Sequence, residues 1–262
     1  MKNETVPVKI RMATQGQIGE VHCTLIQGVP ELTFEEAQTI IGDKSVLVNE
    51  VAAVFSRLFL PPSRVETTHE LPTTLACWFP RAEEFANACL GVKVNFQEMF
   101  NLTDDLLGKN LIPVFDPGTL TNRDAIDGAL KSQHLTVYEE ADMMEYTGSA
   151  AGKTPTLHLI ANSIRPDGKT MGKSPNQLRE MTARFLSLRG YMLAFGLHCF
   201  VTREYLDPET FTWFLENRLP GGSVAYGYWY PARRRVRFSW GYPGYGNGAS
   251  GARAAISVSL RT

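Results

Sequence analysis

The alternation of side chains near the C-terminus constrains the fold of this chain more than any other feature. Between Val224 and Tyr230, tyrosines occupy every second position, and from Arg233 to Trp240 basic or polar residues alternate with apolar ones. A two-residue period places successive side chains on opposite faces of a β-strand. The pattern therefore predicts two strands, whose core-facing residues are Trp229, Val236, Phe238 and Trp240.

The same segment has the composition of a binding surface. From Asn217 to Thr262 there are seven arginines but no acidic residue and no lysine. Tyrosine and tryptophan give rigid contact area, arginine gives forked hydrogen-bond donors, and glycine and serine let loops adapt. We expect the ligand contacts to be Tyr226, Tyr228, Tyr230, Arg233, Arg235, Arg237, Ser239, Tyr242, Tyr245 and Asn247.

An alternative interpretation exists for the arginines. Charged residues on a solvated strand edge oppose aggregation, so Arg233, Arg235 and Arg237 would also suit such an edge. Arg234 falls on the core side of the alternation and is expected to snorkel or pair. Arg253 is expected to be structural rather than a ligand contact.

The remainder of the chain balances this basic tail. The net charge of the 262 residues is −1, because acidic residues cluster in the middle, for example at residues 139–145. This asymmetry favours a locally positive face on a nearly neutral protein. Residues 1–19 lack an apolar segment of signal-peptide length, and the most apolar run, 46–60, is too short and too charged to span a membrane. We therefore expect synthesis in the cytoplasm, without a transmembrane segment; display on a virion or cell surface would need other means.

Local signals along the chain predict a mixed α+β protein. The predicted strands are 6–12, 20–26, 136–138, 156–160 and a closing strand at 252–260, and a Gly-rich loop spans 241–251. Strand ends and turns are expected at Phe79-Pro80 and at 111–118. The predicted helices are 34–41, 122–130 with Asn122 as its cap, 175–186 after the cap Ser174, 190–202, and a short helix from Asp207 through Glu216; residues 46–60 fit either state, with helix preferred.

The segment 147–154 is the best candidate for a linker, because it is rich in small residues. We therefore expect two domains. Residues 1–150 would form an unassigned α+β support or attachment domain, and residues 151–262 a ligand-binding domain.

Three segments, in the same order, resemble the C-type lectin fold in its formylglycine-generating-enzyme-like branch. Tyr205–Glu209 followed by Trp213 is similar to that branch's Leu-Pro-x-Glu-x-x-x-Trp region, although Asp207 precedes Pro208 here. Gly221-Gly222 and the strand that ends at Trp229 resemble its Gly-rich strand. Gly251-Ala252-Arg253 stands where the family has a Gly-aromatic-Arg closing strand. The resemblance covers about residues 156–262 and implies a C-type lectin-like fold in the C-terminal part.

Within that branch, the tail most resembles the variable proteins of diversity-generating retroelements. In that family, adenine-directed mutagenesis randomises selected codons, commonly of AAC type, which can become Tyr, Ser, Gly, Arg, Asn, Ala, Pro, Asp, His, Val or Phe but not Trp, Lys, Glu, Gln or Met. The segment 226–250 fits this set except for Trp229 and Trp240, which would be fixed scaffold. The resemblance implies a protein without catalytic activity whose hypervariable surface recognises varied protein or cell-surface ligands. Neither the ligand nor the oligomeric state follows from the sequence.

Catalytic and metal-binding alternatives have little support in the sequence. Formylglycine generation, as known for the family, needs paired cysteines, whereas residues 151–262 hold only Cys199. Calcium-dependent sugar binding uses clustered carboxylates near the last strands, and the tail has none. We therefore expect no catalytic residue, metal or cofactor. The main alternative partner is nucleic acid, because interleaved arginines and tyrosines can contact phosphates and stack on bases; such binding would depend steeply on salt.

Overall fold

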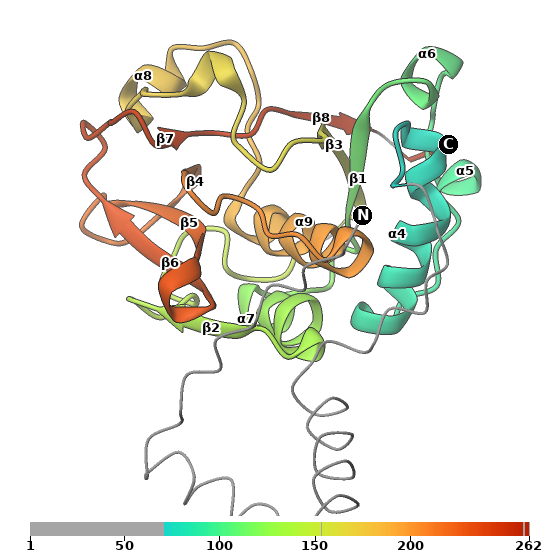
Figure 1. The fold of residues 1–262 in the computed structure, drawn as a ribbon, viewed down its shortest axis with the longest axis horizontal. Helices are drawn as coiled ribbons and strands as arrows, with labels where there is room; N and C mark the ends of the chain where they lie inside the picture. The colour runs from blue at the N-terminus through green and yellow to red at the C-terminus, as the bar shows by residue number, and fades with distance from the viewer. Residues whose placement is uncertain (1–70, 153, 259, 262) are drawn as a thin grey trace, which may run out of the picture. The chain divides into compact units, whose positions relative to one another are not determined.

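The computed structural model describes residues 71–262, apart from residues 153, 259 and 262 (Figure 1). The elements predicted at 6–12, 20–26, 34–41 and 46–60 lie outside the described residues. The described part is a mixture of helices with a three-stranded and a five-stranded sheet, so the predicted α+β class is confirmed for it.

The first described element is the long helix α4, Leu75–Leu90, where a strand end and turn were expected around Phe79-Pro80. The Thr74 side chain caps its start by accepting from the Cys77 backbone N–H, and Gly91 ends it in the left-handed conformation with φ 68°. The helix tolerates Pro80 because one face is packed into the core, and such packing supplies most of a helix's stability in a protein. The short helices α5, Phe96–Met99, and α6, Asp104–Leu107, follow it.

The three-stranded sheet is antiparallel and has the order β1-β3-β8. Its strands are β1, Leu111–Asp116; β3, Thr156–Ala161; and β8, Ala255–Val258. The strand predicted at 156–160 is confirmed, and the segment 111–118 holds a full strand rather than only a strand end. The closing strand is shorter than the predicted 252–260: it spans Ala255–Val258, and Ala252 and Arg253 lie buried before it begins.

Between these strands, the predicted helix at 122–130 is present with two changes. It consists of α7, Asn122–Ala125, and the π-helical turn η1, Ile126–Leu130, followed by the 3-10 turn η2, Lys131–Gln133. Its cap is Thr121, which forms a capping box with Asp124, and not Asn122. Asn122 is instead buried and donates to the Met143 carbonyl at 3.0 Å.

The five-stranded sheet has the order β2-β6-β5-β4-β7. Its strands are β2, Thr136–Glu139; β4, Phe211–Arg218; β5, Val224–Tyr230; β6, Arg235–Gly241; and β7, Ser250–Gly251. The strands expected at 136–138 and 224–230 are confirmed. The short helix expected from Asp207 through Glu216 is wrong, because this stretch forms β4 in the interior of the sheet. Asp207 does not cap a helix: it adopts a left-handed φ of 55° and its carboxylate binds Thr210, Thr212 and Arg253.

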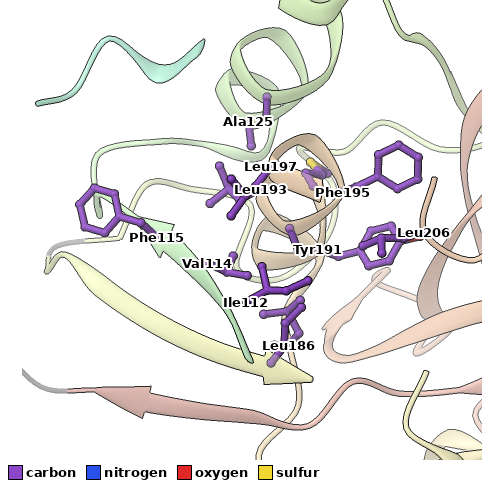
Figure 2. Close-up of a cluster of buried hydrophobic side chains, with 14 of the residues drawn as sticks. Ile112, Val114, Phe115, Ala125, Leu186, Tyr191, Leu193, Phe195, Leu197 and Leu206 are labelled. Carbon is purple, nitrogen blue, oxygen red and sulfur yellow. The ribbon is translucent and has the colours of Figure 1, made fainter. Parts of the chain in front are cut away.

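Two further helices complete the fold. The predicted Ser174 cap is confirmed and opens α8, Pro175–Arg179, which ends well before the expected residue 186. The helix expected at 190–202 is α9, Leu188–Thr202, which is buried along most of its length. Its side chains meet those of β1, such as Ile112 and Val114, in a continuous apolar core (Figure 2).

One core unites the segments on both sides of the expected boundary near residue 150. Residues 70–262 form one compact unit. β1 pairs with β3, and β2 pairs with β6, so each sheet takes strands from before and after 147–154. The expected linker therefore lies inside this unit, and the division into residues 1–150 and 151–262 does not match the strand pairing.

Candidate functional site

The antiparallel pair β5 and β6 presents tyrosines and arginines on one face of the five-stranded sheet. Tyr228 stands opposite Arg237 and Tyr230 opposite Arg235, while Tyr226 stands opposite Ser239. The other face packs against the core helix α9. The ring of Trp229 lies 6.3 Å from that of Phe195, and the ring of Phe238 lies 6.3 Å from that of Tyr191. The predicted alternation is therefore confirmed along β5 and for residues 235–238 of β6. We call the set Tyr226, Tyr228, Tyr230, Arg235 and Arg237 the Tyr–Arg face.

A further aromatic residue, Tyr138 on β2, extends this face. It pairs in register with Arg237, and its ring centroid lies 4.2 Å from the guanidinium carbon of Arg235 and 5.5 Å from that of Arg237. Both guanidinium groups thus lie over an aromatic ring, at cation–π distance. Sequence reasoning missed Tyr138, because only the parallel pairing of β2 with β6 brings it beside the arginines. Its position in a predicted strand was the single available signal.

Glu140, which follows β2, contacts three residues of β6. Its carboxylate lies 3.3 Å from Arg237 and also accepts a hydrogen bond from the Ser239 hydroxyl, while its backbone N–H donates to the Phe238 carbonyl at 3.1 Å. Ser239 was predicted as a ligand contact. It is instead buried, with 3% exposure, because its hydroxyl is engaged with Glu140, so it supports the face from within.

The turn between β5 and β6 carries two more arginines. Pro231–Arg233 form the 3-10 turn η4, and Arg234 follows in the left-handed conformation with φ 48°. The prediction that Arg234 lies on the core side is wrong: the strand begins only at Arg235, so Arg234 is exposed in the turn beside the exposed Arg233. In the described part of the chain, no carboxylate lies within ion-pair distance of Arg233, Arg234 or Arg235.

An aromatic groove of about 680 Å³ adjoins the Tyr–Arg face. The ring of Tyr226 lies 4.8 Å from that of Phe211 and 5.1 Å from that of Trp213. Trp240 was expected in the core, but it is 37% exposed at the end of β6 and lines the groove. The principal groove residues are Phe211, Tyr226, Tyr228, Trp240, Tyr242 and Tyr245, and Pro208–Thr210 form one rim. A volume of this size is typical of ligand sites.

The Gly-rich loop closes the groove on one side and is held in place by specific contacts. Tyr242 and Tyr245 are 73% and 52% exposed. The amide of Asn247 donates to the Tyr245 hydroxyl at 2.7 Å, and its oxygen accepts from the Ala249 backbone N–H at 2.9 Å. The predicted contact Asn247 thus shapes the loop. Gly246 lets the loop approach α8 closely, because a Cβ there would lie 2.7 Å from the Ser174 nitrogen.

A buried ion pair fixes the rim of the groove to the closing segment. Arg253 is 3% exposed and lies 2.7 Å from the carboxylate of the fully buried Asp207. Arg253 also donates to the carbonyls of Ser163 and Ile164, at 2.7 and 3.0 Å. The structural role predicted for Arg253 is confirmed. The pair joins segments 205–209 and 251–253, and therefore positions Pro208–Thr210 along the groove.

The electrostatics of the face favour a neutral phenol at Tyr228. Burial, the largest effect, raises the pKa of Tyr228, so its hydroxyl stays protonated at neutral pH and can donate a hydrogen bond. Across the described residues, no group of three or more His, Cys, Asp or Glu side chains is placed to hold a metal ion, and no helix is long and apolar enough to cross a membrane.

Comparisons of the chain with protein-family models, with curated proteins and with solved structures found no match.

Proposed function

We propose that this protein is a non-catalytic binding protein, with a C-type lectin-like fold in its C-terminal part, whose surface at about 226–250 is diversified by a retroelement. The observation that carries the proposal is the separation of roles along β5 and β6. Tyrosines and arginines face outward beside a groove, while Trp229, Val236 and Phe238 are buried in the core. Such a surface can change its side chains without changing the packing beneath it.

The groove adds a second argument for recognition. Its residues come from β4, β5, the end of β6 and the Gly-rich loop, so ligand contacts rest on a rigid sheet and an adaptable loop together. Tyrosine-rich surfaces with glycine and serine nearby are typical of binding sites that accept many partners. The ligands would be proteins or cell-surface molecules.

Sequencing the encoding locus from several related genomes tests the proposal. We expect amino-acid differences to concentrate at exposed or half-buried surface positions, such as Tyr228, Tyr230, Arg235, Tyr242 and Tyr245, whereas the buried scaffold residues stay constant. A near-copy of the segment and a reverse-transcriptase gene should lie nearby. Locus sequences in which Tyr–Arg face residues are as constant as Trp229 would contradict a diversified surface.

Nucleic-acid binding is the second candidate function. It is favoured by one observation, the placement of Arg235 and Arg237 over Tyr138 at the edge of an arginine-rich turn, since such surfaces can contact phosphates and stack on bases. Titration of a single-stranded oligonucleotide at two salt concentrations discriminates between the candidates. Phosphate contacts would make the affinity for the oligonucleotide fall steeply with salt, whereas the affinity for a neutral ligand of the groove would change little.

A further inference from the structure

We propose that the groove and the β5–β6 turn form one site for a segment of a partner protein in which carboxylates flank an apolar or aromatic side chain. This inference rests on the proposed binding function and specifies the ligand chemistry of the same surface. It follows from three features: an unneutralised cationic end, an aromatic end, and a row of tyrosines that connects them.

The cationic end is the turn and the start of β6. Arg233, Arg234 and Arg235 have no carboxylate partner in the described part of the chain, and only Arg237 is paired, with Glu140 at 3.3 Å. The acidic residue that lines the groove, Glu209, pairs with Arg165. The local field at the turn is therefore positive, and it attracts an anionic group.

The stacking of the arginines prepares them for carboxylates. Arg235 lies over the Tyr138 ring at 4.2 Å and near the Tyr230 ring at 5.8 Å. Stacking on a ring occupies the face of a guanidinium group and leaves its in-plane N–H donors able to form the fork that matches a carboxylate. Preorganisation by the two rings lowers the entropy lost when a ligand carboxylate binds.

The aromatic end and its connection to the arginines define the rest of the ligand. The ring centroids of Tyr226, Tyr228 and Tyr230 are spaced by 6.2 Å at each step, and all three line the groove, with Tyr230 opposite Arg235. Phe211, Trp240, Tyr242 and Tyr245 also line it, and no lysine or arginine is among the lining residues. An apolar or aromatic side chain suits this end.

This uneven distribution of charge favours a peptide segment over a polyanion. A nucleic acid carries a charge at every nucleotide and is bound by cations along its whole path. Here the cations are confined to one end, and the 680 Å³ groove has an aromatic lining. A protein segment with one or two carboxylates beside a large apolar side chain matches both ends.

Selection of random peptides displayed on phage, with the full-length protein as bait, tests this ligand class. We expect the enriched peptides to place Asp or Glu next to Trp, Phe, Tyr or Leu. A synthetic copy of an enriched peptide should bind the R233Q/R234Q variant about tenfold more weakly, since the variant loses two exposed charge pairs that each contribute roughly threefold to affinity. Neither arginine is buried, so this variant should fold like the parent protein.

Matched variants separate the outcomes. K93Q/K131Q removes two positive charges elsewhere on the surface and should leave peptide affinity unchanged, whereas Y242S/Y245S should weaken it through the groove. Enrichment of neutral aromatic peptides that are sensitive only to Y242S/Y245S would overturn the acidic ligand class and leave the proposed binding function intact. Peptide binding that neither R233Q/R234Q nor Y242S/Y245S weakens would overturn the proposed site. Displacement of the peptide by a single-stranded oligonucleotide, with a steep salt dependence, would overturn it too.

Discussion

The buried pair of Asp207 and Arg253 is expected to dominate the stability of the rim of the groove. Asp207 is fully buried, and its carboxylate accepts hydrogen bonds from Thr210 at 3.0 Å, Thr212 at 2.7 Å and Arg253 at 2.7 Å. Asp207→Asn keeps a side chain of the same shape, and Asn also tolerates the left-handed φ of 55°. The change therefore removes the charge of Asp207 and replaces one of its two accepting oxygens by a donating NH2 group.

The size of the expected loss of stability depends on the charge that stays buried after the substitution. In D207N, the guanidinium of Arg253 stays 3% exposed and keeps its bonds to the Ser163 and Ile164 carbonyls, but it loses its counter-charge. Breaking a buried ion pair by removing one partner typically costs about 3–5 kcal/mol. The control is Arg165→Gln, which breaks the exposed pair with Glu209 and should cost at most about 1 kcal/mol.

Urea unfolding followed by tryptophan fluorescence measures both variants. All four tryptophans of the chain lie at or after residue 78, so the signal reports on the compact unit. We expect D207N to lower the unfolding midpoint at an unchanged slope, and D207N/R253M to recover part of the loss, because the second change removes the unpaired charge. A loss of unfolding free energy in D207N no larger than that in R165Q would refute the reasoning that this pair lies in a water-excluded, low-dielectric environment.

Three further predictions concern packing, pH and the proposed contacts. A methyl group on Gly227 would lie 2.9 Å from a core aromatic ring, so Gly227→Ala should lower the free energy of unfolding in urea by about 1–3 kcal/mol. A methyl group on Gly244 would meet nothing within 4 Å, so Gly244→Ala should change it by no more than about 0.5 kcal/mol; equal costs would contradict the packing argument. Burial lowers the pKa of His158, so protonation favours the unfolded chain and stability should fall as the pH drops from 7 to 5; His158→Gln should flatten this fall, and an unchanged pH profile would contradict it. Tyr242→Ser should leave the melting temperature nearly unchanged because the ring is 73% exposed, whereas Trp229→Ala should cost about 3–5 kcal/mol by calorimetry; unfolding of the Tyr242 variant would make that residue part of the core.

Local patterns in the sequence predicted the elements whose signals are short-ranged. The alternation in 224–230 gave the strand β5 with its outward tyrosines, and the Ser174-Pro175 pair gave the start of α8, because period and capping depend only on neighbouring residues. The mixed α+β class followed from the same signals. The predicted contacts that lie exposed or half-buried on one side of the sheet, such as Tyr228 and Arg237, also came from alternation alone.

The errors arose where a distant segment competes with the local signal. Asp207-Pro208-Glu209 has the pattern of a helix start, but the carboxylate of Asp207 is bound by Arg253, 46 positions later, and the following residues pair as the strand β4. Ser239 was expected at the surface by parity, yet its hydroxyl binds Glu140 from 99 positions earlier. The boundary near residue 150 had a local composition signal that could not reveal the pairing of β1 with β3.

The sequence by itself therefore determined which side chains of β5 and of residues 235–238 face away from the core, because strand period is a local property. Only the tertiary structure decided which of them form one site. Tyr138 joins the arginines through the pairing of β2 with β6, and the groove exists because β4, β5, β6 and the Gly-rich loop meet at one corner of the sheet. The physical reason is that burial and cation–π contacts depend on which segments meet in space, and side-chain packing between distant segments sets this.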